Sequence, residues 1–176
     1  MTETQSGFWR FSLGFYALPD VAPACLALQD QAGVDVNVML FLLYLAESGR
    51  LVTTEEIAAL DAEVKEWRTK VVEPLRALRR KLKDGIGEVP QATSETLRTL
   101  VKKVELESER AEQQGLERLA PNIGTPGSGR DQAARHNLAA LAGFLGPLPD
   151  KEIQILLAAF TGNPPSPLYV PDSPPV

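Results

Sequence analysis

Apolar and polar positions along the chain alternate mostly with the period of an α-helix. The clearest stretch runs from Thr53 to Asp84, where apolar side chains recur three and four positions apart. The apolar positions are Ile57, Leu60, Val64, Trp67, Val71, Leu75, Leu78 and Leu82. Thr53 and Glu56 form a capping box at the start, and Gly85 ends the pattern. Because Pro74 lies inside it, we expect a kink or a break near that residue.

The N-terminal third of the sequence is the most apolar part. The predicted helices there are residues 8–16, 20–32 and 36–46. The first is dense in aromatic residues and the third is apolar on every side, which is typical of buried helices. We expect Asp20 and Asp35 to cap the second and third helices, and Gly33 to end the second. Seven of the eleven aromatic residues lie in the first 44 positions, so these helices predict an aromatic-rich core.

A further long helix is predicted from about residue 93 to residue 120. Its apolar or small positions are Leu97, Leu100 or Val101, Val104, Ser108, Ala111, Gly115 and Leu119. Together with the helix over 53–84 it would form a long antiparallel hairpin. The small residues of its second half would let another helix, or a second copy of the chain, approach closely. Shorter helices are predicted at 131–145 and 150–161, and no strand is predicted.

These elements predict an all-α fold in a single domain over residues 1–162. The fold is a helical bundle with an N-terminal aromatic-rich three-helix core and a long antiparallel helical hairpin. A Pro- and Gly-rich stretch at about 121–129 predicts a flexible linker within the domain. Residues 163–176 carry six prolines and predict a disordered tail.

Composition narrows the class of protein. The chain has 176 residues, of which 44% are hydrophobic and 23% are charged, as in ordinary globular proteins. A net charge of −5 argues against a nucleic-acid partner. Cys25 is the single cysteine, which excludes a disulfide within the chain. No apolar run approaches the roughly 20 residues of a membrane span, and the N-terminus lacks a signal-peptide pattern, so we expect a cytoplasmic protein.

Local charge adds a candidate site. Between Pro74 and Val104 there are eight basic and three acidic residues, an excess of five positive charges. In the predicted hairpin this stretch forms the tip. The candidate anion- or partner-binding residues are Arg76, Arg79, Arg80, Lys83, Arg98 and Lys102. Such a cluster fits phosphates or another protein with an acidic surface, and the alternative is a solvated face.

Polar residues beside the apolar third helix form a second candidate. Asp30, Asp35, Asn37, Trp67 and Arg68 would make either a polar pocket or a structural polar core. If the third and fourth helices pack together, Arg68 can reach an aspartate and form a buried ion pair, which is structural by default.

A third group consists of Glu105, Glu109 and Glu112, which share one helical face. We expect interhelical ion pairs or plain solvation here rather than a metal site. Bundle di-metal sites add a Glu-x-x-His motif, whereas Ala133 stands three positions before the single histidine, His136. With no phosphate-binding loop or nucleophile motif either, we predict no metal, no cofactor and no catalytic residue, and an enzyme is not favoured.

Three segments resemble one protein family. They are Phe8-Trp9-x-Phe-Ser-Leu, then Leu28-Gln29-Asp30-x-x-Gly33-Val34-Asp35-Val36-Asn37, then Trp67-Arg68 followed by Val71-Val72-x-Pro74-Leu75-Arg76-x-Leu78-Arg79. As a set they resemble a small family of uncharacterised proteobacterial helical proteins, a domain of unknown function, over about residues 7–120. The resemblance implies a bacterial cytosolic helical protein and transfers no catalytic residue.

Two functions from different classes follow. The first is a non-enzymatic interaction or adaptor protein that uses the basic hairpin tip. The second is a binder of a small molecule or lipid-type ligand in a pocket among the aromatic helices, lined by Phe11, Phe15, Phe41 and Tyr44. An unrecognised enzyme is a third hypothesis, for which the sequence names no reaction.

Overall fold

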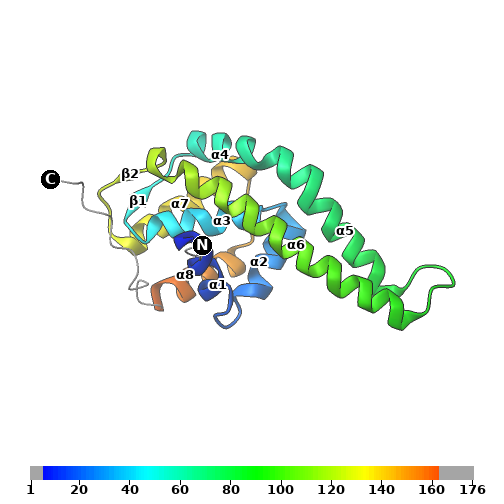
Figure 1. The fold of residues 1–176 in the computed structure, drawn as a ribbon. Coiled ribbons are helices and arrows are strands. Elements are labelled where there is room, and N and C mark those ends of the chain that lie inside the picture. Colours follow the sequence, from blue (N-terminus) through cyan, green and yellow to red (C-terminus); the bar gives the residue numbers. More distant parts are fainter. Residues whose placement is uncertain (1–5, 163–176) are drawn as a thin grey trace.

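The computed structural model of the chain describes residues 6–162 (Figure 1). It confirms the all-α prediction, since helices account for nearly all of the regular structure. The predicted tail at 163–176 lies outside the described residues.

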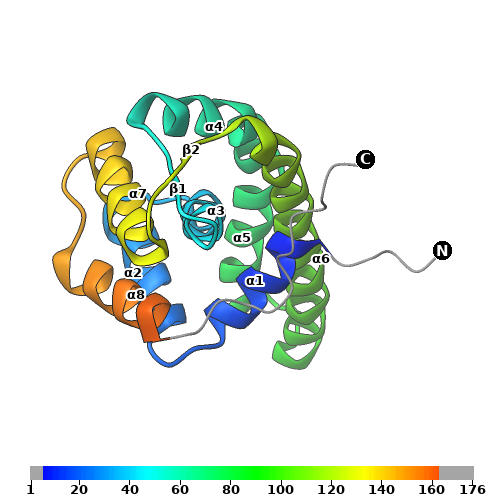
Figure 2. The same cartoon turned by 90° about the vertical axis from the view of Figure 1, so that its left-hand side faces the viewer.

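The helix α3 is the centre of the molecule. The helices of the body are α1 (Gly7–Tyr16), α2 (Val21–Ala32), α3 (Val36–Ala46), α7 (Arg130–Leu145) and α8 (Asp150–Gly162). Figure 2 shows α3 surrounded by its neighbours, as expected of a helix that is apolar on all sides. The aromatic rings pack beside it: Phe8 meets Phe41 edge to face at 5.1 Å between centroids. Phe15 meets Phe160 of α8 at 6.2 Å, so the core extends beyond the first three helices.

The predicted hairpin is present and one end projects beyond the body (Figure 1). Its elements are α4 (Thr54–Trp67), a π-helix (Arg68–Val72), α5 (Glu73–Lys81), a 3-10 turn (Leu82–Asp84) and α6 (Gln91–Leu119). The expected interruption near Pro74 takes the form of the π-helix. Proline lacks an N–H and cannot continue the α-helical ladder, and the N–H of Glu73 instead bonds the carbonyl of Arg68 five residues earlier.

One short pair of strands was not predicted. β1 (Arg50–Leu51) pairs antiparallel with β2 (Thr125–Pro126). β2 lies in the segment that was predicted as a flexible linker, and the Arg50 guanidinium also donates to the carbonyls of Ala120 and Gly124. Gly49 makes the close approach feasible: its φ is +69°, and a Cβ there would lie 2.1 Å from the carbonyl oxygen of Ser128.

The helix caps follow the sequence in part. The Asp35 carboxylate accepts from the N–H groups of Asn37 and Val38 at 2.8 and 3.2 Å, which confirms it as the N-cap of α3. Gly33 ends α2 with a left-handed φ of +65°, as expected. The prediction for Asp20 was wrong, because this residue is itself left-handed (φ +63°) and its side chain makes no capping bond.

The predicted apolar face of α6 was right at Val101 and Ser108, which are buried, and wrong at Leu97, Leu100 and Val104. Leu97, Leu100 and Val104 are about half exposed, at 48%, 54% and 54%. The buried positions of α6 are Ser94, Val101, Glu105, Ser108, Glu112, Gln113 and Leu116. Polar side chains thus occupy the inner face of this helix, because partners on α3 and α5 meet them there.

Among the described residues, no single helix is both long and apolar enough to cross a membrane. α1 and α2 meet that test only as a pair, bent by 99° at their junction.

Candidate functional site

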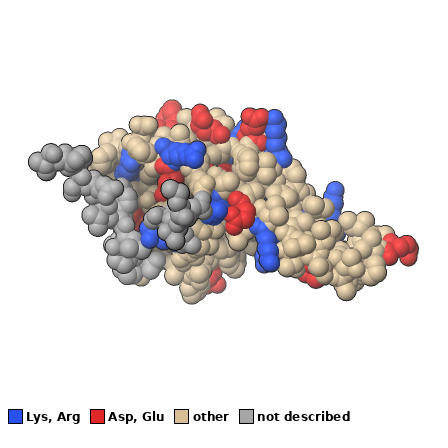
Figure 3. All heavy atoms as spheres, in the orientation of Figure 1, with Lys and Arg blue, Asp and Glu red and all other residues tan. Residues whose placement is uncertain are grey.

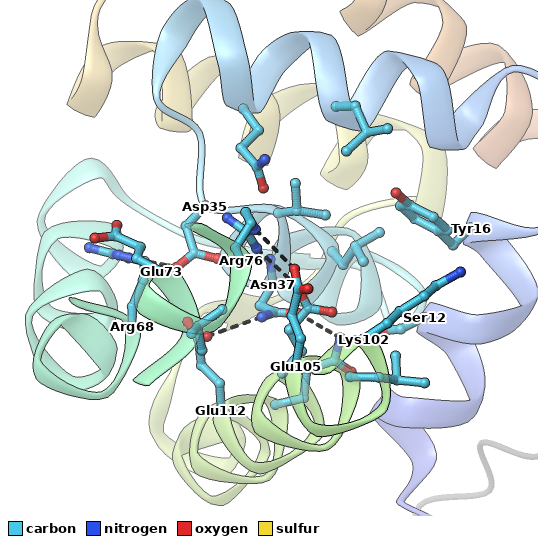
Figure 4. A pocket seen from close by; sticks show the side chains of 18 of the residues that line it. Ser12, Tyr16, Asp35, Asn37, Arg68, Glu73, Arg76, Lys102, Glu105 and Glu112 are labelled. Carbon is cyan, nitrogen blue, oxygen red and sulfur yellow. Dashed lines mark hydrogen bonds and ion pairs between the residues drawn. The ribbon is translucent and has the colours of Figure 1, made fainter. Parts of the chain in front are cut away.

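A pocket of about 950 Å³ lies between the hairpin and the body. Its walls come from α1, α2, the start of α3, the π-helix with α5, and α6. Figure 4 shows polar side chains from four of these segments around one space. A volume of this size is at the upper end of what small-molecule sites enclose.

Amides and a carboxyl group form the inner end of the pocket. Asn37 donates through Nδ2 to Glu112 Oε2 at 3.1 Å and accepts through Oδ1 from Gln113 Nε2 at 2.9 Å. Both α6 residues are only 3% exposed. The first turn of α3 therefore holds two polar side chains of α6 on the buried face.

An ion-pair network lies next to this inner end. Arg68 Nη1 bonds Asp35 Oδ2 at 2.6 Å and Asp61 Oδ1 at 2.8 Å. Arg68 belongs to the π-helix, so the interruption of the long helix coincides with the residue that reaches across to α3. π-helical turns occur often at functional sites, and this one borders the pocket.

Glu112 is a neutral acid near pH 7 in this setting. Burial, followed by the charge of Asp35, raises the pKa of Glu112 to about 9. Glu112 Oε1 accepts no hydrogen bond from the described residues, so it is the oxygen on which the proton can reside. The pocket thus presents a carboxylic acid beside a carboxylate.

The outer part of the pocket is bounded by ion pairs between α5 and α6. Arg76 bonds Glu109 Oε1 at 3.0 Å, and its Nε lies 3.4 Å from Glu105 Oε1. Arg79 bonds Glu105 through Nε and, at 3.1 Å, through Nη2. Burial raises the pKa of Glu109, against the opposing effect of Arg76. These contacts confirm the prediction of interhelical ion pairs for Glu105 and Glu109. The prediction was wrong for Glu112, which is buried against the Asn37 amide instead of a basic side chain.

Three buried polar atoms around the pocket have no hydrogen-bond partner among the described residues. They are Ser12 Oγ, Glu112 Oε1 and Gln113 Oε1. Each belongs to a pocket residue that is 3% exposed. Buried polar atoms are paired in the great majority of cases, so three together leave hydrogen-bonding capacity for a bound molecule.

The wall contributed by α1 and α2 is mostly apolar, with Trp9, Leu13, Tyr16 and Leu26 among its members. Burial raises the pKa of the Tyr16 hydroxyl. The aromatic residues predicted to line a pocket do not line this one. They pack against one another instead, as with Phe11 and Phe15, whose stacked rings lie 5.6 Å apart.

The fold brings only some residues of the predicted basic cluster to the pocket. Arg76, Arg79, Arg80 and Lys102 border the pocket, whereas Lys83 and Arg98 do not. Arg80 pairs with Asp30 at 3.1 Å in an exposed contact, and Arg98 pairs with Glu95 at 2.7 Å. On the face in Figure 3, acidic and basic side chains are interspersed and the hairpin end carries few charges of either sign.

The predicted polar group is divided in the same way. Asp35, Asn37 and Arg68 border the pocket, and Asp30 and Trp67 do not. Trp67 is 41% exposed and donates through Nε1 to the Ser108 carbonyl at 2.9 Å, which fastens α4 to α6.

Sequence reasoning missed Ser12, Tyr16 and Gln113 as pocket residues. The available signal was weak: a serine within an aromatic helix and a glutamine following Glu112 look like solvent-facing residues until the helix faces are known. Glu105 and Glu109, four positions apart, were noted as an acidic face, and Arg76 and Arg79, three positions apart, share a face of their own helix.

Metal and thiol chemistry find little support within residues 6–162. No three His, Cys, Asp or Glu side chains there converge to hold a metal ion. Burial raises the pKa of the Cys25 thiol to about 12, so it is a poor nucleophile near neutral pH.

A comparison with known protein families assigns the chain to one of them. The model of the family described as "Protein of unknown function (DUF2390)" matches residues 7–116. The chain belongs to this family. Every residue that borders the pocket lies inside the DUF2390 region, between Trp9 and Gln113, while α7 and α8 lie outside it. None of the curated proteins and none of the solved structures compared with the chain matches it.

Proposed function

We propose that this DUF2390 protein binds a small organic molecule in the pocket between α1, α2, α3, α5 and α6. The observation that carries the proposal is the set of three buried, unpartnered polar atoms on Ser12, Glu112 and Gln113. Leaving such atoms without a partner costs about 1–3 kcal/mol each. A ligand that supplies the missing hydrogen bonds would offset that cost.

The walls support the same function. One side of the pocket is apolar and the other carries fixed charges held by ion pairs, a combination that provides both affinity and orientation. The neutral acid of Glu112 adds a donor or acceptor in a position shielded from water. A reaction needs an activated nucleophile or a general base placed at a reacting atom, and the described residues show no such arrangement, so binding is the better-supported function.

Native mass spectrometry on untagged protein, purified gently from its own host, tests the proposal. We expect an additional mass of a few hundred daltons that is lost on denaturation. Leu13→Trp, which narrows the pocket, should abolish it. Leu145→Trp, at an exposed site outside the pocket, should not. An unmodified mass for the wild type, or equal retention by both variants, would contradict the proposal.

A second candidate function is the binding of a protein with an acidic surface by the hairpin end. The observation that favours it is the apolar row of Leu97, Leu100 and Val104, which is half exposed on the outer face of α6. Lys83, exposed at the same hairpin end, fits an acidic partner. A second copy of the chain is the alternative occupant.

Arg76 and Arg79 are unsuitable for testing that surface because they hold α5 and α6 together. The better variant is Leu97→Glu with Leu100→Glu, compared with Leu13→Trp in the pocket. Loss of a partner from pull-downs with the first variant but not the second supports a protein interface. Unchanged capture contradicts it, and a doubled mass in sedimentation would identify a homodimer.

We also propose a bacterial and cytoplasmic setting. The single cysteine is buried with a free thiol, which suits a reducing compartment. Fractionation of the host with an antibody to the protein tests this assignment.

A further inference from the structure

The pocket is long, and α6 gives it a direction. Lys102, Glu105, Glu109 and Gln113 recur three and four positions apart and all border it. At 1.5 Å per residue, Lys102 and Gln113 are separated by about 16 Å along the helix axis. A molecule that used both ends would therefore be elongated.

The helix α1 runs antiparallel to α6 along the same length. The N–H of Phe8 donates to Glu117 Oε1 at 3.0 Å. Tyr16 is close enough to Glu109 for the charge of that carboxylate to raise the pKa of the Tyr16 hydroxyl. Ser12 is midway between Phe8 and Tyr16, and so lies level with Gln113. The three unpartnered atoms consequently gather at one end of the pocket.

The opposite end has an excess of positive charge. Two carboxylates, Glu105 and Glu109, are already shared by Arg76 and Arg79. Lys102 and Lys103 border the same end, and their side chains form no ion pair or hydrogen bond within residues 6–162. Their charges are available to a bound anion.

The inner end would reject an anion. Asp35 is there, and burial together with the negative charge of Asp35 keeps Glu112 neutral. Arg68 does not make the inner end favourable to an anion, since its charge is already paired with Asp35 and Asp61. A hydroxyl or amide group can supply what Ser12 and Gln113 lack without adding charge. Between the two ends, Leu13 and Leu106 offer apolar contacts.

Resting on the proposed function, we infer that the ligand is an elongated organic anion. Its charged group lies at Lys102 and Lys103, its apolar body lies along α1, and its far end carries a hydroxyl or amide that hydrogen-bonds to Ser12, Glu112 and Gln113. Carboxylates and phosphates share the chemistry of the charged end.

Isothermal titration calorimetry on the full chain tests whether the pocket prefers a negatively charged ligand. The probes are 10-hydroxydecanoate, its phosphate counterpart 10-hydroxydecyl phosphate, and uncharged 1,10-decanediol. The wild type should bind one or both anions about tenfold or more tightly than the diol, since a charge-assisted contact is worth at least that factor. The tighter of the two anions identifies the headgroup. Lys102→Glu with Lys103→Glu should abolish the preference for the anion.

Controls come from the same chain. Lys81→Glu with Lys83→Glu makes the same charge change at exposed sites outside the pocket and should retain the preference. Ser12→Ala should bind 10-hydroxydecanoate no better than decanoate, whereas the wild type should favour the hydroxyl.

Three results would overturn the assignment of ligand class. They are a diol affinity equal to that of the anions, an anion preference in the Lys102/Lys103 variant equal to that of the wild type, and no binding of any probe. The proposed function is judged separately by the native mass. A co-purified molecule that proves neutral or cationic would leave that function standing and remove this inference.

Discussion

The interior around α3 and the interior between α3, α5 and α6 are built from different side chains. Around α3 the buried residues are apolar and aromatic, with Phe8, Phe15 and Phe41 at most 2% exposed. On the neighbouring helix α6, the buried face holds Glu105 and Glu112 at 6% and 3% exposure. Both regions are enclosed, and the first contains few buried polar side chains, such as Asn137, which donates to the Leu42 carbonyl at 3.0 Å.

The two regions are held in place by different interactions. Apolar packing tolerates several combinations of side chains that conserve the total volume, whereas a buried carboxylate requires a particular partner. The buried carboxyl groups of Glu105 and Glu112 each bond a side chain of another helix. One polar atom each of Ser12, Glu112 and Gln113 has no partner among the described residues. The apolar region therefore supplies stability, and the polar region supplies a site.

The largest effect should come from the apolar region. Phe41→Ala removes a ring that is fully buried against Phe8, and the free energy of unfolding should fall by about 3–5 kcal/mol. Guanidinium unfolding followed by circular dichroism measures it. Phe41→Leu should cost clearly less, and a loss below about 1 kcal/mol for the alanine variant would contradict a packed core.

Breaking the ion-pair cluster should have the next largest effect. Glu105→Ala leaves Arg76 and Arg79 short of a partner, at an expected cost of about 2 kcal/mol in unfolding free energy. That is below the loss for a fully buried pair, because both arginines are partly exposed. Glu107→Ala, on the exposed side of α6, should cost under about 0.5 kcal/mol. Equal losses for the two variants would show that burial does not distinguish these carboxylates.

A pH-dependent effect should come from Glu112, which faces Asp35, Asn37 and Arg68. Its pKa is higher in the folded chain than the ordinary 4.5, so folding binds a proton and stability declines as pH rises from 4.5 towards 9. Glu112→Gln keeps the shape of the neutral acid and does not titrate. Its unfolding free energy relative to the wild type should therefore increase by about 1–1.5 kcal/mol from pH 6 to pH 7.

Urea unfolding at several pH values measures that increase. Glu66→Gln, at an exposed site, is the control, and its difference from the wild type should not change with pH over this range. A flat difference for Glu112→Gln would mean that Glu112 is ionised in the folded protein.

The smallest effect should come from the outer face of α6. Leu97→Gln and Leu100→Gln should each change the unfolding free energy by less than about 0.5 kcal/mol, since both side chains are half exposed. Val101→Gln, which places an amide at a 7% exposed position next to Leu100, should cost about 2 kcal/mol. Thermal unfolding distinguishes the variants at Leu97 and Leu100 from the variant at Val101. A larger loss of stability for the leucine variants would support the apolar face predicted from the sequence.

The site was predictable only in part. Asp35, Asn37 and Arg68 were identifiable because polar groups beside a buried helix need partners. Ser12, Tyr16 and Gln113 were not, because a single helix does not reveal which of its faces a distant helix will cover. The basic stretch from Pro74 to Val104 looked unbalanced because three of the carboxylates paired with its arginines, Asp30, Glu105 and Glu109, lie outside it in sequence.

By itself, the sequence determined the helices, their caps at Thr53 and Asp35, the interruption before Pro74 and the central place of α3. These depend on hydrogen bonds and apolar periodicity within a few residues of each position. Tertiary structure alone decided that α6 turns Glu105 and Glu112 inward and Leu97 and Leu100 outward. The physical reason is that a carboxylate can be buried wherever another helix brings an arginine or an amide, and that partner lies dozens of residues away along the chain.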